Sequence, residues 1–192
     1  PTQVDEAMAA GATWLTHLYN GIPLQVERQG ILDFELDSAL GAMLICDGTH
    51  VKSYCLHLAL CLKGVGSIIA VSDQSALSGA PLTPLEASQP LWGTSVRVDR
   101  HPTLDTSIII GENGMLAGSW ANMLWCMNHM ARLFAQWNAR NEPWTVADLW
   151  QIGRENPLRV LGRTADQLAH LPLAKIAWQD GRFVRLGAGE SA

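Results

Sequence analysis

Short apolar runs that each end at a titratable residue constrain the fold of this chain more than any other feature. Residues 12–16 lead to His17, residues 42–46 lead to Asp47 and His50, and residues 67–72 lead to Asp73. Continuous apolar runs of this length are typical of strands that are buried on both faces of a parallel sheet. In parallel α/β barrels, the catalytic groups lie at the C-terminal ends of the strands. Three such endings in succession therefore predict a single site along one rim of a parallel sheet.

The composition of the 192-residue chain limits its partners and its location. The formal net charge is -5 and the Lys and Arg residues are scattered, so no basic face is available for nucleic acid. The longest apolar stretches, such as residues 56–62, are too short to span a bilayer, and the first residues lack the features of a signal peptide. We therefore expect a cytoplasmic protein with no membrane or nucleic-acid partner. Because the four cysteines contain no Cys-x-x-Cys pair, neither a disulfide framework nor a structural zinc site is expected.

The first part of the chain alternates between helical and strand patterns. The expected elements are a helix at 2–10, a strand at 12–18, a short helix at 36–40, a strand at 42–46, a helix at 51–63 ended by Gly64, and a strand at 67–72. Such alternation indicates βα units and a parallel sheet. About three units are too few to close an eight-stranded barrel, which takes about 250 residues. We therefore expect an α/β fold that forms the C-terminal part of a larger (β/α)8 barrel.

The second part of the chain is expected to add a β-ribbon, further helices and a hairpin. The patterns predict alternating strand residues at 91–100, a strand at 107–111, a turn at 112–114, a helix from a Ser119 cap to about residue 138, a helix opened by Thr145 with Asp148 in a capping box, a short helix from Pro157 to Gly162, and strands at 175–178 and 183–186 around Asp180-Gly181. We assign residues 1–165 to the partial barrel. Residues 166–192 are assigned to a few strands of a small accessory β-sandwich.

Five ordered segments of the chain carry a resemblance to a known enzyme family. They are T-H-L-Y-N-G-I-P at 16–23, C-D-G-T-H-V at 46–51, V-S-D at 71–73, N-G-M-L-A-G-S at 113–119, and E-N-P-L-R at 155–159 with L-G at 161–162. Their order and spacing resemble the signature blocks of the N-acetylglucosamine-6-phosphate deacetylases of the amidohydrolase superfamily. The resemblance implies a metal-dependent hydrolase of amino-sugar catabolism, which converts N-acetylglucosamine 6-phosphate to glucosamine 6-phosphate and acetate.

The resemblance also implies a role for individual residues. His17 matches a metal ligand, and Asp73 matches the general acid/base. Residues matching substrate-binding positions of the family are Asn20, Gly21, Arg28, His50, Leu116, Ala117 and Gly118. The implied cofactor is a divalent metal, which lowers the pKa of its bound water toward about 7 and so supplies a nucleophile. Zinc is favoured over iron or another ion. The arginine that matches Arg28 crosses a subunit interface in the family, so a homodimer is expected.

Several residues have a simpler structural interpretation. Asp47 precedes a glycine, and we favour an Asx turn for it. Arg28 can pair with Glu27 as a solvated charge. Packing or surface exposure explains the remaining histidines, which are His57, His101, His129 and His170.

The metal ligands that the family takes from other segments have no match in this chain. A Gly-His block would fall a few residues before the position of Pro1, and a glutamate would lie further upstream. Because catalytic zinc sites normally have three protein ligands, we expect these 192 residues alone not to hydrolyse the substrate. Two interpretations stay open: the C-terminal half of an active deacetylase, for the gluco or the galacto isomer, or a non-catalytic remnant that retains phosphosugar binding or an interaction.

Overall fold

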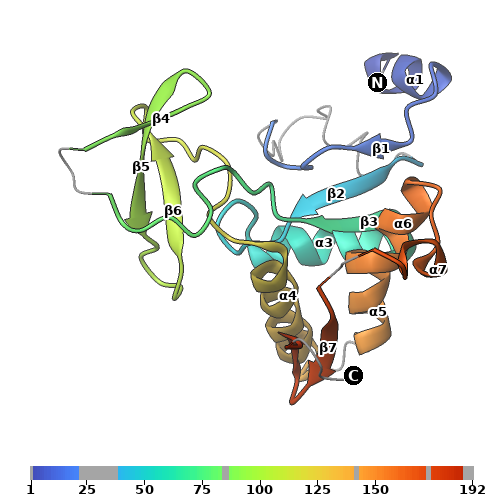
Figure 1. Cartoon of the computed structure of the whole chain (residues 1–192). Helices are drawn as coiled ribbons and strands as arrows, with labels where there is room; N and C mark the ends of the chain where they lie inside the picture. Colours follow the sequence, from blue (N-terminus) through green and yellow to red (C-terminus); the bar gives the residue numbers. More distant parts are fainter. Residues whose placement is uncertain (1, 22–38, 84–86, 141–142, 172–173, 188–192) are drawn as a thin grey trace.

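A parallel sheet occupies the centre of the computed structural model, which describes residues 2–21, 39–83, 87–140, 143–171 and 174–187 (Figure 1). Its three strands are β1 (Trp14–Leu15), β2 (Gly41–Ile45) and β3 (Ile68–Val71), in that order across the sheet. Leu15 pairs with Ala42, and Ile45 pairs with Val71. The parallel arrangement of the three predicted strands is confirmed, and their C-terminal ends lie along one rim.

The first strand is shorter than the strand expected at 12–18. The backbone of His17 has φ +37°, in the left-handed region, and this turn ends the regular strand. The chain rejoins the sheet one residue later, where the Leu18 N–H donates to the Met43 carbonyl at 2.9 Å. His17 therefore stands at the end of β1 on a bent backbone.

The helix after β2 confirms its predicted end. α3 (Ser53–Lys63) packs its buried residues against the sheet, and Gly64 follows with φ +71° while its N–H donates to the Leu60 carbonyl at 2.9 Å. The 3-10 turn η1 (Val65–Ser67) then leads into β3. Near the start of the chain, α1 (Thr2–Ala9) confirms the first predicted helix. The short helix expected at 36–40 lies mostly outside the described residues.

A separate antiparallel ribbon follows the loop after β3 (Figure 1). It consists of β4 (Gln89–Leu91), β5 (Thr94–Arg100) and β6 (Ser107–Gly111), and it has a small apolar core of its own. Residues 91–100 were expected to alternate without a break, but Trp92 and Gly93 form a turn with φ +50° and +80°. Positive φ at both central residues is the geometry of a type I′ hairpin turn.

The long helix α4 (Met123–Asn138) ends where the sequence predicted but begins later. Its N-cap is Asn122, whose side-chain oxygen accepts from the Trp125 N–H at 2.9 Å. The prediction that Ser119 caps this helix is therefore wrong. Ser119 lies three residues earlier, on an extended segment, and its hydroxyl is used elsewhere.

The next helical run passes through a wide turn. α5 (Val146–Trp150) has the predicted capping box between Thr145 and Asp148, and it continues directly into the π-helical segment η2 (Gln151–Glu155) and α6 (Asn156–Val160). The short helix predicted at Pro157 is confirmed to within one residue as α6, with Pro157 in its first turn, but it follows η2 without a break. In a regular α-helix, proline lacks the needed N–H and its ring clashes with the carbonyl four residues earlier. The π-helical turn just before Pro157 carries the helix past this position.

The C-terminal hairpin has its own two-stranded sheet but shares the main core. After α7 (Ala165–Leu168) come β7 (Ile176–Gln179) and β8 (Arg182–Arg185), joined by the predicted turn, in which Asp180 and Gly181 have φ +49° and +77°. Asn128 of α4 donates to the Phe183 carbonyl at 2.9 Å and accepts from its N–H at 2.7 Å. The Phe183 ring belongs to the main core cluster. The hairpin therefore packs on α4. The domain boundary predicted at residue 165 stays a prediction.

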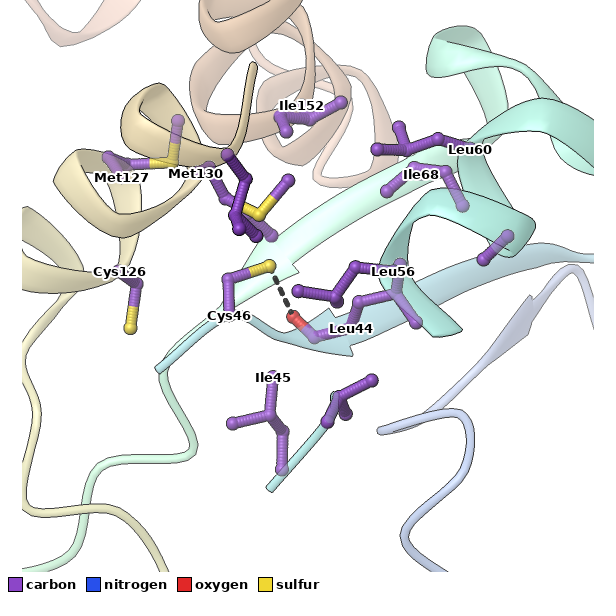
Figure 2. Packing of buried hydrophobic residues seen from close by; sticks show 14 of the residues in the cluster. Leu44, Ile45, Cys46, Leu56, Leu60, Ile68, Cys126, Met127, Met130 and Ile152 are labelled. Carbon is purple, nitrogen blue, oxygen red and sulfur yellow. Dashed lines mark hydrogen bonds between the residues drawn. The ribbon is translucent and has the colours of Figure 1, made fainter. Parts of the chain in front are cut away.

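The main core lies between the sheet, α3, α4 and the α5–α6 run (Figure 2). Figure 2 shows Leu44 of β2 and Leu56 of α3 on one side, and Met130 of α4 with Ile152 of η2 on the other. The four cysteines are among the described residues and are free thiols: Cys46, Cys55 and Cys126 are buried, whereas Cys61 is exposed. This core fixes the loops that follow β2 and β3.

Candidate functional site

The ends of β1, β2 and β3 bring the predicted site residues to one rim. Register pairs the last residues of β2 and β3, and the Cys46 N–H donates to the Val71 carbonyl at 3.1 Å just beyond them. His17 and Asp73 both have left-handed backbones, with φ +37° and +52°. Such conformations are uncommon for residues other than glycine, and they gather at functional sites.

The loop after β1 holds its predicted residues close together. The Asn20 N–H donates to the His17 carbonyl at 3.0 Å, and a Cβ on Gly21 would lie 3.9 Å from the His17 ring. Asn20 and Gly21 are exposed, and the Asn20 N–H is held by the His17 carbonyl, so the N–H of Gly21 is the backbone donor that this loop can offer to a ligand. The prediction for Arg28 falls outside the described residues.

Asp47 is the most highly connected polar side chain on this rim. It is 3% exposed, and its Oδ1 accepts from the N–H groups of Thr49 at 2.8 Å and His50 at 3.0 Å. Its Oδ2 accepts from His50 Nδ1 at 2.7 Å and from the Ser119 hydroxyl at 2.9 Å. Burial raises the pKa of Asp47, but hydrogen bonds and charge from His50 outweigh it, so the pKa lies below its ordinary value. The Asx turn is confirmed, and the carboxylate also binds two side chains.

His50 has one of its two ring nitrogens engaged by Asp47. Its side chain is 8% exposed, and Nδ1 is held by Asp47, so Nε2 is left to meet a ligand. Gly48 has φ +84°, and a Cβ there would come within 2.8 Å of the His129 ring. Only glycine therefore fits the turn that places His50.

The histidines that surround this turn have structural roles. His101 Nδ1 accepts from the N–H groups of Thr103 at 3.1 Å and Leu104 at 2.9 Å, which confirms a packing role for it. His129 packs against Gly48, as the packing interpretation expects. Burial, followed by the charge of Arg132, lowers the pKa of His129. The neutral form of His129 is therefore favoured at neutral pH.

The segment that contains Leu116, Ala117 and Gly118 runs beside Asp73. The Ala117 N–H donates to the Ile109 carbonyl at 3.1 Å, which extends the ribbon toward the rim. Gly118 has φ +69°, and a Cβ there would lie 3.0 Å from the Trp92 ring and 3.4 Å from the Asp73 carbonyl. The predicted substrate-binding segment and the predicted acid/base residue are thus adjacent. The Asp73 side chain itself is exposed.

Ser119 joins these parts, and the sequence interpretation missed this role. Its N–H donates to the Asp73 carbonyl at 2.8 Å, its carbonyl accepts from the Ser75 N–H at 3.1 Å, and its hydroxyl donates to Asp47. The indole N–H of Trp125 also donates to the Asp47 carbonyl, at 3.1 Å. The available signal was the position of Ser119 at the end of the N-G-M-L-A-G-S block, where it was assigned to a helix cap.

A complete metal centre is not formed by the described residues. Among them, no group of three or more His, Cys, Asp or Glu side chains is arranged to hold a metal ion. His17 alone does not fit a catalytic metal, which normally needs three protein ligands. Any further ligands would come from residues beyond those described.

The helices of the described residues also fall short of the requirements for crossing a membrane. In this part of the chain, no helix combines the length and the apolar character needed to cross a bilayer.

Comparisons with known proteins support the family resemblance. No family model matches the chain. An N-acetylglucosamine-6-phosphate deacetylase from Bacillus subtilis (strain 168) is 29% identical over 161 residues, which cover 83% of this chain and 36% of the relative. Another, from Lysinibacillus sphaericus, is 31% identical over 133 residues, which cover 68% of this chain and 32% of the relative. The chain therefore spans about a third of the length of the curated relatives it matches.

A solved structure is similar to this fold. The N-acetylglucosamine-6-phosphate deacetylase from Thermotoga maritima superposes with a TM-score of 0.69 at 22% identity, over 84% of this chain and 40% of that chain. At this identity the similarity concerns the fold. Together with the curated relatives, it confirms the resemblance that the five sequence segments indicated.

Proposed function

We propose that this chain forms the C-terminal part of an N-acetylglucosamine-6-phosphate deacetylase, with its parallel sheet as part of a (β/α)8 barrel. The observation that carries the proposal is the order of three adjacent parallel strands, whose C-terminal ends are followed in the chain by His17, His50 and Asp73 respectively. In barrels of this kind, that rim is where chemistry takes place. The named activity of the relatives supports the same reaction.

Asp73 is the residue proposed to move the proton. Its carboxylate is exposed at the end of β3 and stands beside the segment that would line the substrate. A carboxylate in this position can accept a proton from the attacking water and then pass it to the departing amine nitrogen. The left-handed backbone of Asp73, tied to Ser119, would hold the carboxylate at the rim.

The phosphate of the substrate is proposed to bind near His50 and the loop after β1. The imidazole, the N–H group of Gly21 beside Asn20, and the guanidinium of Arg28 can all donate hydrogen bonds to an anion. If Arg28 reaches across a subunit interface, the site needs a homodimer. Leu116, Ala117 and Gly118 would contact the sugar.

A divalent metal, with zinc favoured over iron, is proposed as the cofactor. It would supply Lewis-acid activation of the acetyl carbonyl and of water. His17 would be one of its ligands, and the others would come from residues beyond those described.

The test is acetate release from N-acetylglucosamine 6-phosphate by the full-length protein that carries these residues. Asp73→Asn is expected to lower kcat by about 10²–10⁴-fold, the usual contribution of general acid/base catalysis, with unchanged metal content. The control is Asp99→Asn, which removes a partly exposed carboxylate of β5 that pairs with Arg97. Turnover by Asp73→Asn near the level of this control would contradict the role of Asp73.

The same experiment separates the alternatives. Binding of the phosphosugar without acetate release would favour the non-catalytic interpretation. A higher kcat/KM for N-acetylgalactosamine 6-phosphate than for the gluco isomer would assign the galacto specificity. For the metal, His17→Ala is expected to lower the bound stoichiometry, and an unchanged stoichiometry would contradict its ligand role.

A further inference from the structure

The carboxylate of Asp47 has no capacity left for a ligand. A carboxylate offers about four acceptor positions on its two oxygens, and in this structure Asp47 accepts four hydrogen bonds from described residues. Two come from backbone N–H groups of its own turn, one from His50 and one from Ser119. The side chain is 4% exposed, so a ligand at the rim would not reach it. Asp47 can therefore act only through its partners.

The first partner is the imidazole of His50. At 2.7 Å from Oδ2, Nδ1 must carry a proton, because the carboxylate can only accept. In the neutral ring, Nε2 is then an acceptor, and in the protonated ring it is a donor. Either way, the ring is fixed with Nε2 facing away from Asp47. A flipped ring would lose the short bond, so the orientation is selected by Asp47.

The second partner is Ser119, which connects Asp47 to the segment of Asp73. Ser119 is 1% exposed, and its hydroxyl donates to Asp47 at 2.9 Å while its oxygen accepts from the Ala121 N–H at 3.0 Å. Its backbone bonds to Asp73 and Ser75 form a parallel bridge next to Gly118. One residue thus links the loop after β2, the loop after β3 and the Leu116–Gly118 segment.

We propose that Asp47 is a positioning residue that fixes the tautomer and orientation of His50 for phosphosugar binding, and that Ser119 couples this unit to the loop that bears Asp73. The ligand named here rests on the proposed function. The tautomer and the coupling follow from the hydrogen bonds alone.

The decisive variant is Asp47→Asn, which keeps the shape of the side chain. Oδ1 is fixed as an acceptor by two backbone N–H groups, so the new amide nitrogen must take the place of Oδ2. It would donate to Nδ1 of His50, and the neutral ring would then carry its proton on Nε2. The ¹⁵N chemical shifts of the His50 ring in the full-length protein measure this directly. We expect an Nδ1–H tautomer in the wild type and an Nε2–H tautomer in Asp47→Asn.

Binding provides the second readout. Isothermal titration with N-acetylglucosamine 6-phosphate is expected to give about a tenfold weaker Kd for Asp47→Asn, since hydrogen bonds to charged groups contribute about 1.5–3 kcal/mol. A parallel titration with inorganic phosphate tests the anion alone.

Ser119→Ala tests the coupling, with Ser78→Ala as its matched control. Ser78 also donates its hydroxyl to a neighbouring carbonyl, that of Trp120, at 2.6 Å, but it has no bond to Asp47. Ser119→Ala is expected to raise KM and also lower kcat, because it loosens both His50 and Asp73. Ser78→Ala should leave both constants unchanged, and Ser119→Thr, which restores a hydroxyl, should recover part of the loss.

Clear outcomes would overturn the inference. An Nε2–H tautomer in the wild type refutes the role of Asp47 without any variant. Equal effects of Ser119→Ala and Ser78→Ala refute the coupling. If the wild type shows the Nδ1–H tautomer but binds no phosphosugar, the positioning unit stands and the proposed function fails.

Discussion

Two buried polar side chains hold the two ends of the central sheet, and they differ in charge and in what they leave free. Asn156 lies at the N-terminal end of β3, is 0% exposed, and donates to the Val65 and Ile68 carbonyls at 2.7 and 2.6 Å while accepting from Gln151 at 2.6 Å. Asp47, at the opposite end of the sheet, is charged. The partners of Asn156 are all internal to the fold.

This difference between Asn156 and Asp47 indicates that one stabilises the fold and that the other supports the proposed site. Both residues belong to segments that carried the family resemblance, and both have their hydrogen bonds satisfied within the described residues. Asn156 joins the entry of β3 to the helical run, which is a matter of stability. Asp47 holds Nδ1 of His50 and so leaves Nε2 for the binding role proposed above. In barrel folds, the rim at the strand C-termini carries chemistry and the opposite rim carries stability.

The largest effect is expected for Asn156→Ala. It leaves two carbonyls and the Gln151 amide without their partner, and each orphaned buried group costs roughly 1–3 kcal/mol. We expect a loss of about 4 kcal/mol in the free energy of unfolding, measured by urea denaturation, and no change in phosphosugar Kd for the folded fraction. The control is Asn138→Ala, which removes two hydrogen bonds to the Trp144 backbone at an exposed site, where water can replace them. Equal losses for both variants would contradict the role assigned to Asn156.

A smaller loss of stability is expected for Gly48→Ala, in the turn after β2 at the C-terminal rim of the sheet. The left-handed backbone costs about 1–2 kcal/mol with a side chain, and overlap of the Cβ with the His129 ring adds to it. We expect a loss of about 3 kcal/mol together with weaker phosphosugar binding, because His50 lies two residues further along the turn. Gly79→Ala is the matched control, since Gly79 has φ +76° with open space around it. If Gly79→Ala weakens binding as much, the contact with His129 is irrelevant.

The smallest effect is a pH dependence of the free energy of unfolding, which should distinguish Asp47 from Asn156. The folded pKa of Asp47 lies below its unfolded value of about 3.9. Its charge therefore stabilises the fold above about pH 4, and this contribution is lost as the pH falls through the folded pKa. The stability difference between wild type and Asp47→Asn should shrink between pH 5 and pH 3, whereas the difference for Asn156→Ala should stay constant. Parallel curves for both variants in urea denaturation would contradict the assignment.

Local chemistry accounts for the parts of the fold that the sequence predicted well. The Asp180-Gly181 turn, the end of α3 at Gly64 and the capping box of Thr145 each depend on neighbours within a few positions. The apolar runs predicted the parallel strands, because burial on both faces needs no knowledge of their partners. Such features can be read from short windows of sequence.

The parts that failed depend on distant contacts or on backbone bends. Ser119 and Asn122 are both good N-cap residues, and the choice between them is decided by Asp47, 72 positions away from Ser119. The left-handed turn at His17 shortened β1, and the π-helical turn removed the break expected at Pro157. The candidate rim was anticipated, but the link between its loops was not, since hydrogen bonds between loops leave no periodic pattern.

The hairpin turn of the ribbon has a consequence for the solvent exposure of one indole. Trp92 is 73% exposed, yet its ring edge lies against Gly118, beside the predicted sugar-binding segment. An indole in that position changes its solvent exposure whenever the Leu116–Gly118 segment moves or is covered. The chain thus carries an indole at the edge of its rim, and the solvent exposure of Trp92 would change on occupancy there.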